Sequence, residues 1–370
     1  MDGQNSILDR VISSKQSTEI EQFNPSEVVS QLFKALTSRE EDVLRRRHGL
    51  SGKPRETLEE IGATYSVTRE RVRQIENTAI SKIQRLKDFG TVVNPIESIV
   101  STVLEQHGGI MSEEDLLAQL LQVVGDTDTS RHNILFIISE LLDGSFKLIK
   151  EDDEFRRAWR TQHAPIHIMK EVIQSVLTII TEFNKPISST ELVNRFKQTE
   201  AYTRNQDQLN DDALISYVQV SQKISKNPFD EYGISEWGSI VPRRMNDKIY
   251  LVLKKNGKPM HFTEITKMIN ETKFDSRKAY PPTVHNELIL NDQYVLVGRG
   301  IYALKEWGYK PGVVASVLIE ILRAAGHPLG RDELVRLVLD QRMVKKNTVH
   351  LALTDKTKFK KLPDGTYTLV

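Results

Sequence analysis

Residues 57–87 contain two helical patterns separated by a short turn, which is the layout of a helix-turn-helix motif. Thr57 is a favourable N-cap for the first helix. The turn covers residues 65–67, and Thr68 can cap the second helix. The apolar residues of that second helix recur every three or four positions, at Val72, Ile75, Ala79, Ile83 and Leu86.

The same spacing leaves four polar side chains on the outer face of the second helix, within its first two turns: Arg69, Glu70, Arg73 and Gln74. Arginine can donate two hydrogen bonds to guanine, glutamate can accept one from cytosine, and glutamine can pair with adenine. A recognition helix inserts this end into the major groove. The pattern therefore predicts the base-reading residues of a DNA-binding motif.

Residues 36–50 read Leu-Thr-Ser-Arg-Glu-Glu-Asp-Val-Leu-Arg-Arg-Arg-His-Gly-Leu and lead directly into this motif. Together, residues 36–87 closely resemble region 4 of the sigma-70 family of RNA polymerase initiation factors. His48 stands where that family often has an aromatic residue. The resemblance implies double-stranded DNA with a −35-like promoter element as the target, and the β-flap of RNA polymerase core as a second partner.

Carried over by position, the resemblance makes Arg69, Glu70, Arg73 and Gln74 the base readers. It also implies phosphate contacts from the surrounding residues, for which we take Arg39, Arg45, Arg47, Thr57, Thr68 and Arg71. The alternative for the arginine run 45–47 is a solvated charged face. About 35 residues precede the motif, and they resemble neither region 2 nor region 3 of the family. We therefore do not expect this chain to open promoters alone by the standard sigma route.

A nine-residue pattern recurs four times after the motif, beginning at Gly108, Asn184, Gly257 and Gly326. The offsets of 76, 73 and 69 residues indicate one small domain per repeat. An amphipathic helix precedes each pattern, and these helices are expected at residues 96–106, 168–183, 245–255 and 313–325.

The third repeat has the clearest signals for the elements on the C-terminal side of the pattern. Residues 282–290 predict a third helix, and residues 294–304 predict a hairpin with the turn Gly298-Arg299-Gly300. Three helices and a hairpin are the winged-helix arrangement. Residues 244–308 resemble the HARE-type winged helix of the delta subunit of bacterial RNA polymerase, a module also found in restriction enzymes. Arg299 is a candidate phosphate contact, because a turn between glycines can approach a DNA backbone closely.

The predicted fold is thus mainly α, a region-4-like helix-turn-helix followed by four winged-helix modules. The expected boundaries are a partly flexible N-terminal segment at 1–35, the helix-turn-helix at 36–90, and winged helices at 95–162, 166–241, 244–308 and 311–370.

The charge is unevenly distributed although the net charge is only +1. Residues 37–87 contain 12 Lys and Arg against 8 Asp and Glu, and residues 310–370 contain 11 against 6. The region between them is acidic and includes the run Glu151-Asp152-Asp153-Glu154 in the presumed wing of the first repeat. Basic ends favour phosphate contact, whereas the acidic middle favours contact with protein.

No enzyme is indicated by the sequence. It lacks a phosphate-binding loop and a dinucleotide fingerprint. It has no cysteine, and Pro165 separates His163 from His167, so we expect neither a metal nor a cofactor nor a small-molecule ligand. No signal peptide and no membrane-spanning run are visible, which favours a cytoplasmic protein without a membrane partner.

The sequence therefore predicts a DNA-binding transcription factor that acts in or regulates initiation. One alternative is a delta-like modulator that binds RNA polymerase and hardly reads DNA. Another is an accessory DNA-binding subunit of a restriction or defence system. The target sequence, the activating or repressing effect and the oligomeric state stay open.

Overall fold

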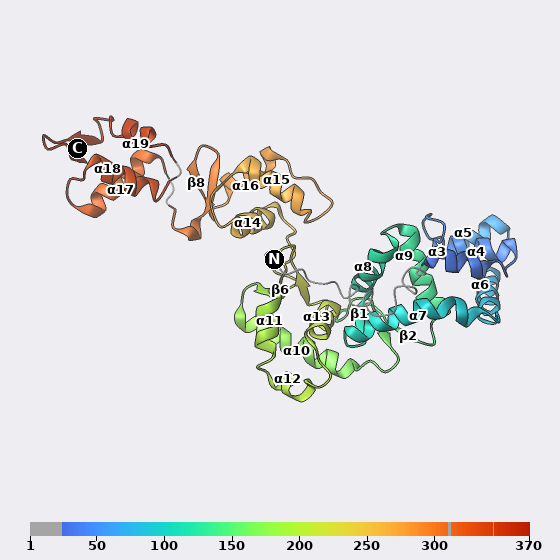
Figure 1. Cartoon of the computed structure of the whole chain (residues 1–370). Coiled ribbons are helices and arrows are strands. Elements are labelled where there is room, and N and C mark those ends of the chain that lie inside the picture. Colours follow the sequence, from blue (N-terminus) through green and yellow to red (C-terminus); the bar gives the residue numbers. More distant parts are fainter. Residues whose placement is uncertain (1–23, 310–311, 343) are drawn as a thin grey trace. The chain divides into compact units, whose positions relative to one another are not determined.

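The computed structural model describes residues 24–309, 312–342 and 344–370, which form mainly α-helices with a few short strands (Figure 1). The mainly α fold is confirmed to that extent. The chain divides into two compact units between Ser225 and Lys226, and each unit is described by itself below. The module expected at residues 166–241 spans this division.

Among the described residues of the first unit, the first four helices are α3 (Pro25–Phe33), α4 (Ser38–His48), α5 (Leu58–Tyr65) and α6 (Arg69–Gln84). Helices α5 and α6 begin directly after the threonines that the sequence predicted as caps. Helix α6 ends at Gln84, so Leu86 lies beyond it.

Helix α3 lies in a segment for which the sequence analysis predicted no element. The Asn24 side chain caps it by accepting a hydrogen bond from the Glu27 amide. Val29, Leu32 and Phe33 are each no more than 2% exposed. The segment expected to be partly flexible is therefore folded from Asn24 onward, and its earlier residues lie outside the described part of the chain.

The next elements form a small helical module with one antiparallel sheet of order β1-β3-β2. Its long first helix continues through Pro95, whereas the sequence predicted a start after that proline. The elements are α7 (Phe89–Gln106), β1 (Ile110–Ser112), α8 (Glu113–Val124), α9 (Asp128–Phe136), the π-helical turn η1 (Ile137–Leu141), β2 (Phe146–Ile149) and β3 (Ala158–Thr161).

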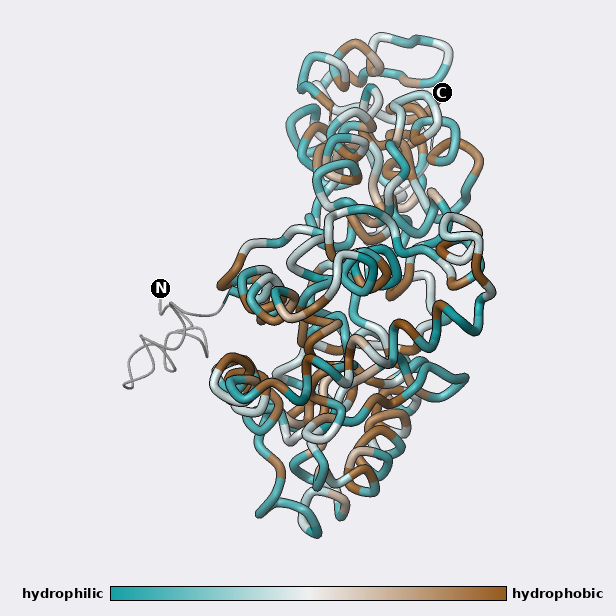
Figure 2. Tube along the Cα trace, turned by 90° about the vertical axis from the view of Figure 1, so that its right-hand side faces the viewer, coloured by the Kyte–Doolittle hydropathy of each residue, from teal (hydrophilic) through white to brown (hydrophobic). Residues whose placement is uncertain are grey.

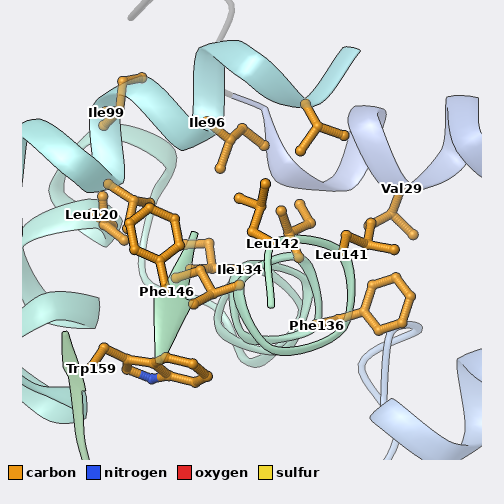
Figure 3. Packing of buried hydrophobic residues seen from close by; sticks show 14 of the residues in the cluster. Val29, Ile96, Ile99, Leu120, Ile134, Phe136, Leu141, Leu142, Phe146 and Trp159 are labelled. Carbon is orange, nitrogen blue, oxygen red and sulfur yellow. The ribbon is translucent and has the colours of Figure 1, made fainter. Parts of the chain in front are cut away.

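One hydrophobic core joins this module to α3, α4 and α6. Figure 3 shows Val29 of α3 beside Phe136 at the end of α9, with Ile96 of α7 in the same cluster. The Phe136 ring lies 5.9 Å from the Phe33 ring and 4.9 Å from the His48 ring, measured between centroids. Because α9 contacts both α3 and α4, this helix is covered by the preceding domain.

The remaining elements of the first unit also pack against the module before them. They are α10 (Ile166–Phe183), β4 (Ile187–Ser188), α11 (Ser189–Phe196), α12 (Glu200–Asn205), α13 (Asp211–Val220) and the start of β5 (Ile224–Lys226). Helix α13 packs against β1, and its Tyr217 is fully buried.

Two hydrogen bonds fix this contact between α13 and the preceding module. The Tyr217 hydroxyl donates to the Gly108 carbonyl oxygen at 2.6 Å, and the Ser216 hydroxyl donates to the Ile110 carbonyl oxygen at 2.7 Å. Gly108 has a φ of +72°, and a Cβ there would lie 2.5 Å from the tyrosine oxygen. Only glycine therefore allows this approach.

The second unit contains two small helical groups, each with its own core. Strand β6 (Glu231–Ile234) precedes these groups and belongs to neither core. The first group comprises α14 (Met245–Asn256), β7 (Met260–His261), α15 (Phe262–Thr272), α16 (Pro281–Leu290), β8 (Tyr294–Gly298), β9 (Ile301–Leu304) and the 3-10 turn η2 (Lys305–Trp307). Strands β7, β9 and β8 form an antiparallel sheet, in which β8 and β9 form the expected hairpin. The second group comprises α17 (Val314–Ala325), α18 (Arg331–Leu339), α19 (Lys346–Ala352), β10 (Phe359–Lys361) and β11 (Tyr367–Leu369).

Hydrophilic and hydrophobic stretches alternate along the helices of both units (Figure 2). Within the described ranges, no helix combines the length and the apolar character that crossing a bilayer requires.

Candidate nucleic-acid interface

Two threonines set the starting points of the helix-turn-helix. The Thr57 amide donates to the Glu60 carboxylate at 2.7 Å, and the Glu60 amide donates to the Thr57 hydroxyl oxygen at 3.2 Å. This reciprocal pair is a capping box at the start of α5. At the start of α6, the Thr68 hydroxyl oxygen accepts from the Arg71 amide at 3.3 Å.

The angle between α5 and α6 is held by a tight turn and a small core. Ser66 adopts a left-handed conformation with φ +53°. A Cβ on Gly62 would lie 2.7 Å from the Val67 carbonyl oxygen, so the turn passes directly over α5. Val43, Ile61 and Val72 are fully buried between α4, α5 and α6. The motif is therefore preorganised.

All four predicted base readers lie exposed on α6, within its first two turns: Arg69, Glu70, Arg73 and Gln74. The side chains of Arg73 and Glu70 are 52% and 58% exposed. The apolar face of the helix turns inward, with Val72, Ala79 and Ile83 fully buried. The predicted division of this helix into an inner and an outer face is confirmed.

These reader side chains are paired with neighbouring residues. The Arg73 guanidinium donates twice to the Glu70 carboxylate, at 2.9 and 2.6 Å. Its hydrogen bonds hold the pKa of Glu70 below the ordinary value, so the carboxyl stays ionised. Arg71 donates to the Gln74 side-chain oxygen at 3.1 Å, and Arg69 lies 3.1 Å from the Glu59 carboxylate. Exposed pairs of this kind are weak and can exchange for base contacts.

The predicted phosphate contacts occupy different environments. Arg39 lies 4.9 Å above the Tyr65 ring. Arg47 donates to the Glu56 carbonyl oxygen at 3.3 Å and lies 3.7 Å from the Glu76 carboxylate. Thr57, Thr68 and Arg71 are exposed around the N-termini of α5 and α6, where backbone amides favour anions.

Two further predicted phosphate contacts, Arg45 and Arg299, lie elsewhere. Arg45 is bound by Glu41 at 2.7 Å and lies 5.2 Å over the Phe33 ring, so it faces α3. Arg299 lies in the second unit, in the turn between β8 and β9, followed by Gly300 with φ +69°.

Some contacts that hold the motif were not predicted. The Arg46 guanidinium binds the Glu56 carboxylate at 2.5 Å. Arg46, the middle residue of the arginine run, therefore has a structural role. His48 Nε2 lies 3.1 Å from the Glu76 carboxylate, and its ring packs against Phe136 at an interplanar angle of 57°. Because Glu76 and Phe136 are distant in sequence, no local pattern reveals these pairs.

Comparison with known proteins agrees with this geometry. Residues 32–85 match the family model described as "Sigma-70, region 4". A 69-residue stretch is 48% identical to the RNA polymerase sigma factor SigA of a Bacillus species, covering 17% of this chain and 18% of that protein. The segment 32–85 is therefore a sigma-70 region 4 domain. The chain spans less than a fifth of the length of that relative.

Among the described residues, no group of three or more histidine, aspartate and glutamate side chains is arranged to hold a metal ion.

Proposed function

We propose that this protein is a DNA-binding transcription factor whose region-4 domain reads a −35-like promoter element. The observation that carries the proposal is the exposed face of α6, which presents Arg69, Glu70 and Arg73 from its first turns. These donors and acceptors match the major-groove edges of guanine and cytosine. The proposed role is binding, without catalysis.

RNA polymerase core is the proposed protein partner, with its β-flap as the docking point. The support is the region-4 domain itself, since the similar SigA protein is named as an RNA polymerase sigma factor. A pull-down of the tagged protein after nuclease digestion tests this. Core subunits retained without DNA support the partner, and their absence contradicts it.

The helical groups after region 4 are proposed to be winged helices, with a HARE-like third module at residues 244–308. In a winged helix, the third helix is the one placed for DNA reading. The corresponding helices of the first two groups, α9 and α13, are covered by other parts of the first unit. We propose that these two groups hold the chain together and leave sequence reading to α6.

Selection from random duplexes tests the proposed base reading. The full chain is incubated with a random duplex pool, and retained duplexes are sequenced over several rounds. An enriched asymmetric motif supports the proposal, and its scrambled version serves as the reference duplex. A pool that stays random after selection contradicts it.

A second candidate function is a delta-like modulator that binds RNA polymerase and hardly reads DNA. It is favoured by the exposed acidic residues 151–154 in the loop between β2 and β3, which repel phosphate. Core binding together with a random selected pool supports this alternative over the first.

A further inference from the structure

A groove of about 440 Å³ lies in the first unit, where the C-terminal end of α4 meets strands β2 and β3. Four cationic side chains line it: Arg47 and Arg55 from the region-4 domain, and Lys147 and Arg157 from the following module. We propose that this groove binds backbone phosphates of the DNA that flanks the element read by α6. The inference rests on the proposed DNA binding and extends it to a second domain.

The two sides of the groove are fixed relative to each other. His132 Nδ1 of α9 lies 2.9 Å from the carbonyl oxygen of Gly49, the residue that ends α4. The His48 ring, which also lines the groove, lies 4.9 Å from the Phe136 ring. Because both contacts join the region-4 domain to the next module, the four cations form one surface in the free protein.

Among the described residues, Arg55 and Lys147 have no carboxylate partner, whereas Arg157 pairs with Glu113 and Arg47 lies 3.7 Å from Glu76. Within the described ranges, no ion pair or hydrogen bond engages the exposed Arg55 side chain. The Lys147 ammonium donates to the backbone carbonyl oxygen of Asp143 at 2.7 Å. Arg157 pairs with Glu113 at 2.6 Å but keeps its side chain 45% exposed. An ammonium or guanidinium in such surroundings retains donors for a phosphate oxygen.

Carboxylates lie both in the lining of the groove and beside it, where Glu113 pairs with Arg157 and Glu76 lies 3.7 Å from Arg47. Glu140 and Asp143 also line the groove, so four cations face two carboxylates. The four carboxylates of residues 151–154 are not part of its lining. Counted over the lining alone, the cations outnumber the carboxylates, which favours an anion such as phosphate.

The groove also continues the proposed DNA surface. Arg55 precedes Thr57, the cap of α5, by two positions, and Arg47 donates to the intervening Glu56 carbonyl oxygen at 3.3 Å. A duplex held in its major groove by α6 carries phosphates on both sides of the contact. A cationic row that starts beside the cap of α5 would meet the phosphates of one flank.

A double variant, Lys147→Gln with Arg157→Gln, tests the assignment in the full chain. The matched control is Lys185→Gln with Arg195→Gln, which removes the same charge from exposed side chains beside Phe183. Affinity is measured for duplexes that carry the selected element with flanks of about 5 or about 25 base pairs on either side.

Each flank is lengthened separately. The wild type should bind more tightly when the flank that meets the groove is lengthened, and the control variant should show the same increase in affinity. The groove variant should lose that gain, and its salt slope on the long duplex should be smaller by about two. Its unchanged affinity for the short duplex shows that it is folded. An equal gain by groove variant and wild type would overturn the inference.

Two further results separate the possible failures. If the wild type prefers no sequence, the proposed base reading fails, while long and short random duplexes still test the groove. If flank length has no effect but pyrophosphate protects the wild type, and not the groove variant, against heat, the site takes a small phosphorylated ligand. That result overturns the assignment to DNA.

Discussion

The Arg73 guanidinium binds the Glu70 carboxylate through two hydrogen bonds, at 2.9 and 2.6 Å, on the exposed face of α6. Both residues are proposed base readers, so in the free protein the two readers are hydrogen-bonded to each other. Reading a base requires the pair to open. Its two side chains are more than half exposed, and water and salt weaken such a contact.

Arg73→Ala should weaken binding to the selected duplex by about tenfold to a hundredfold, since a bidentate contact to guanine is lost. Binding to the scrambled duplex should change little. Equilibrium titration of both duplexes at one salt concentration measures the effect. Arg131→Ala is the control, because it removes another arginine paired through two bonds with a carboxylate, that of Asp126. Equal losses on both duplexes would refute base reading by Arg73.

Tyr217→Phe should lower the free energy of unfolding by about 1–3 kcal/mol, because the half-buried carbonyl oxygen of Gly108 loses its donor. The effect should also depend on pH. Burial raises the pKa of Tyr217 to about 12 from its ordinary value of 10.0. The neutral hydroxyl therefore stabilises the fold fully below pH 10, and this contribution is lost as the pH rises towards 12.

Urea unfolding at several pH values up to 11 measures this contribution. The difference in stability between the wild type and Tyr217→Phe should shrink above pH 10. The comparison cancels the titration of lysines common to both proteins. A constant difference across that range would show that the hydroxyl does not titrate as its burial requires.

Gly49→Ala should destabilise the first unit by about 1–3 kcal/mol. Gly49 ends α4 with φ +70°, where a side chain is strained. An added Cβ would also lie 2.7 Å from His132 Nδ1 and would push α9 away from α4. Gly144→Ala is the control, because a Cβ there meets no atom within 4 Å. Thermal unfolding compares the two variants, and equal melting temperatures would contradict this role of the contact.

Glu40→Gln should weaken the fold at neutral pH and make it less sensitive to acid. The Lys82 ammonium, by hydrogen bonding, holds the pKa of the Glu40 carboxyl below its ordinary value of 4.5. Its stabilising effect is therefore present above pH 4.5 and is lost as the pH falls through the lower folded-state pKa. Urea unfolding of both proteins at pH 6 and at pH 3 gives the difference in their free energies of unfolding. This difference should be smaller at pH 3, and a larger difference at pH 3 would contradict the prediction.

The reader face and its caps were predictable because their signals are local. Thr57 and Thr68 precede regular apolar spacings, and a period of three to four residues fixes which side chains of α6 face outward. The hairpin β8–β9 was predictable for the same reason, from alternation on either side of Gly298-Arg299-Gly300.

The surfaces covered by neighbouring modules were not predictable from such patterns. Tyr217 meets Gly108, and Phe136 meets His48, across long stretches of chain. The apolar residues of α9 and α13 have the same spacing whether they line one module's core or an interface between two. For the same reason the sequence did not separate Arg46 and Arg47 from Arg45: their partners Glu56 and Glu76 lie beyond α4, whereas Arg45 pairs with Glu41 within that helix.

Two buried aromatic residues lie at the junctions between the modules of the first unit. Phe136 packs against His48 of α4, in the core that also contains Ala79 and Ile83 of α6, and Tyr217 of α13 binds Gly108. A load placed on α13 would therefore reach the reader helix through packed side chains as well as through the chain itself.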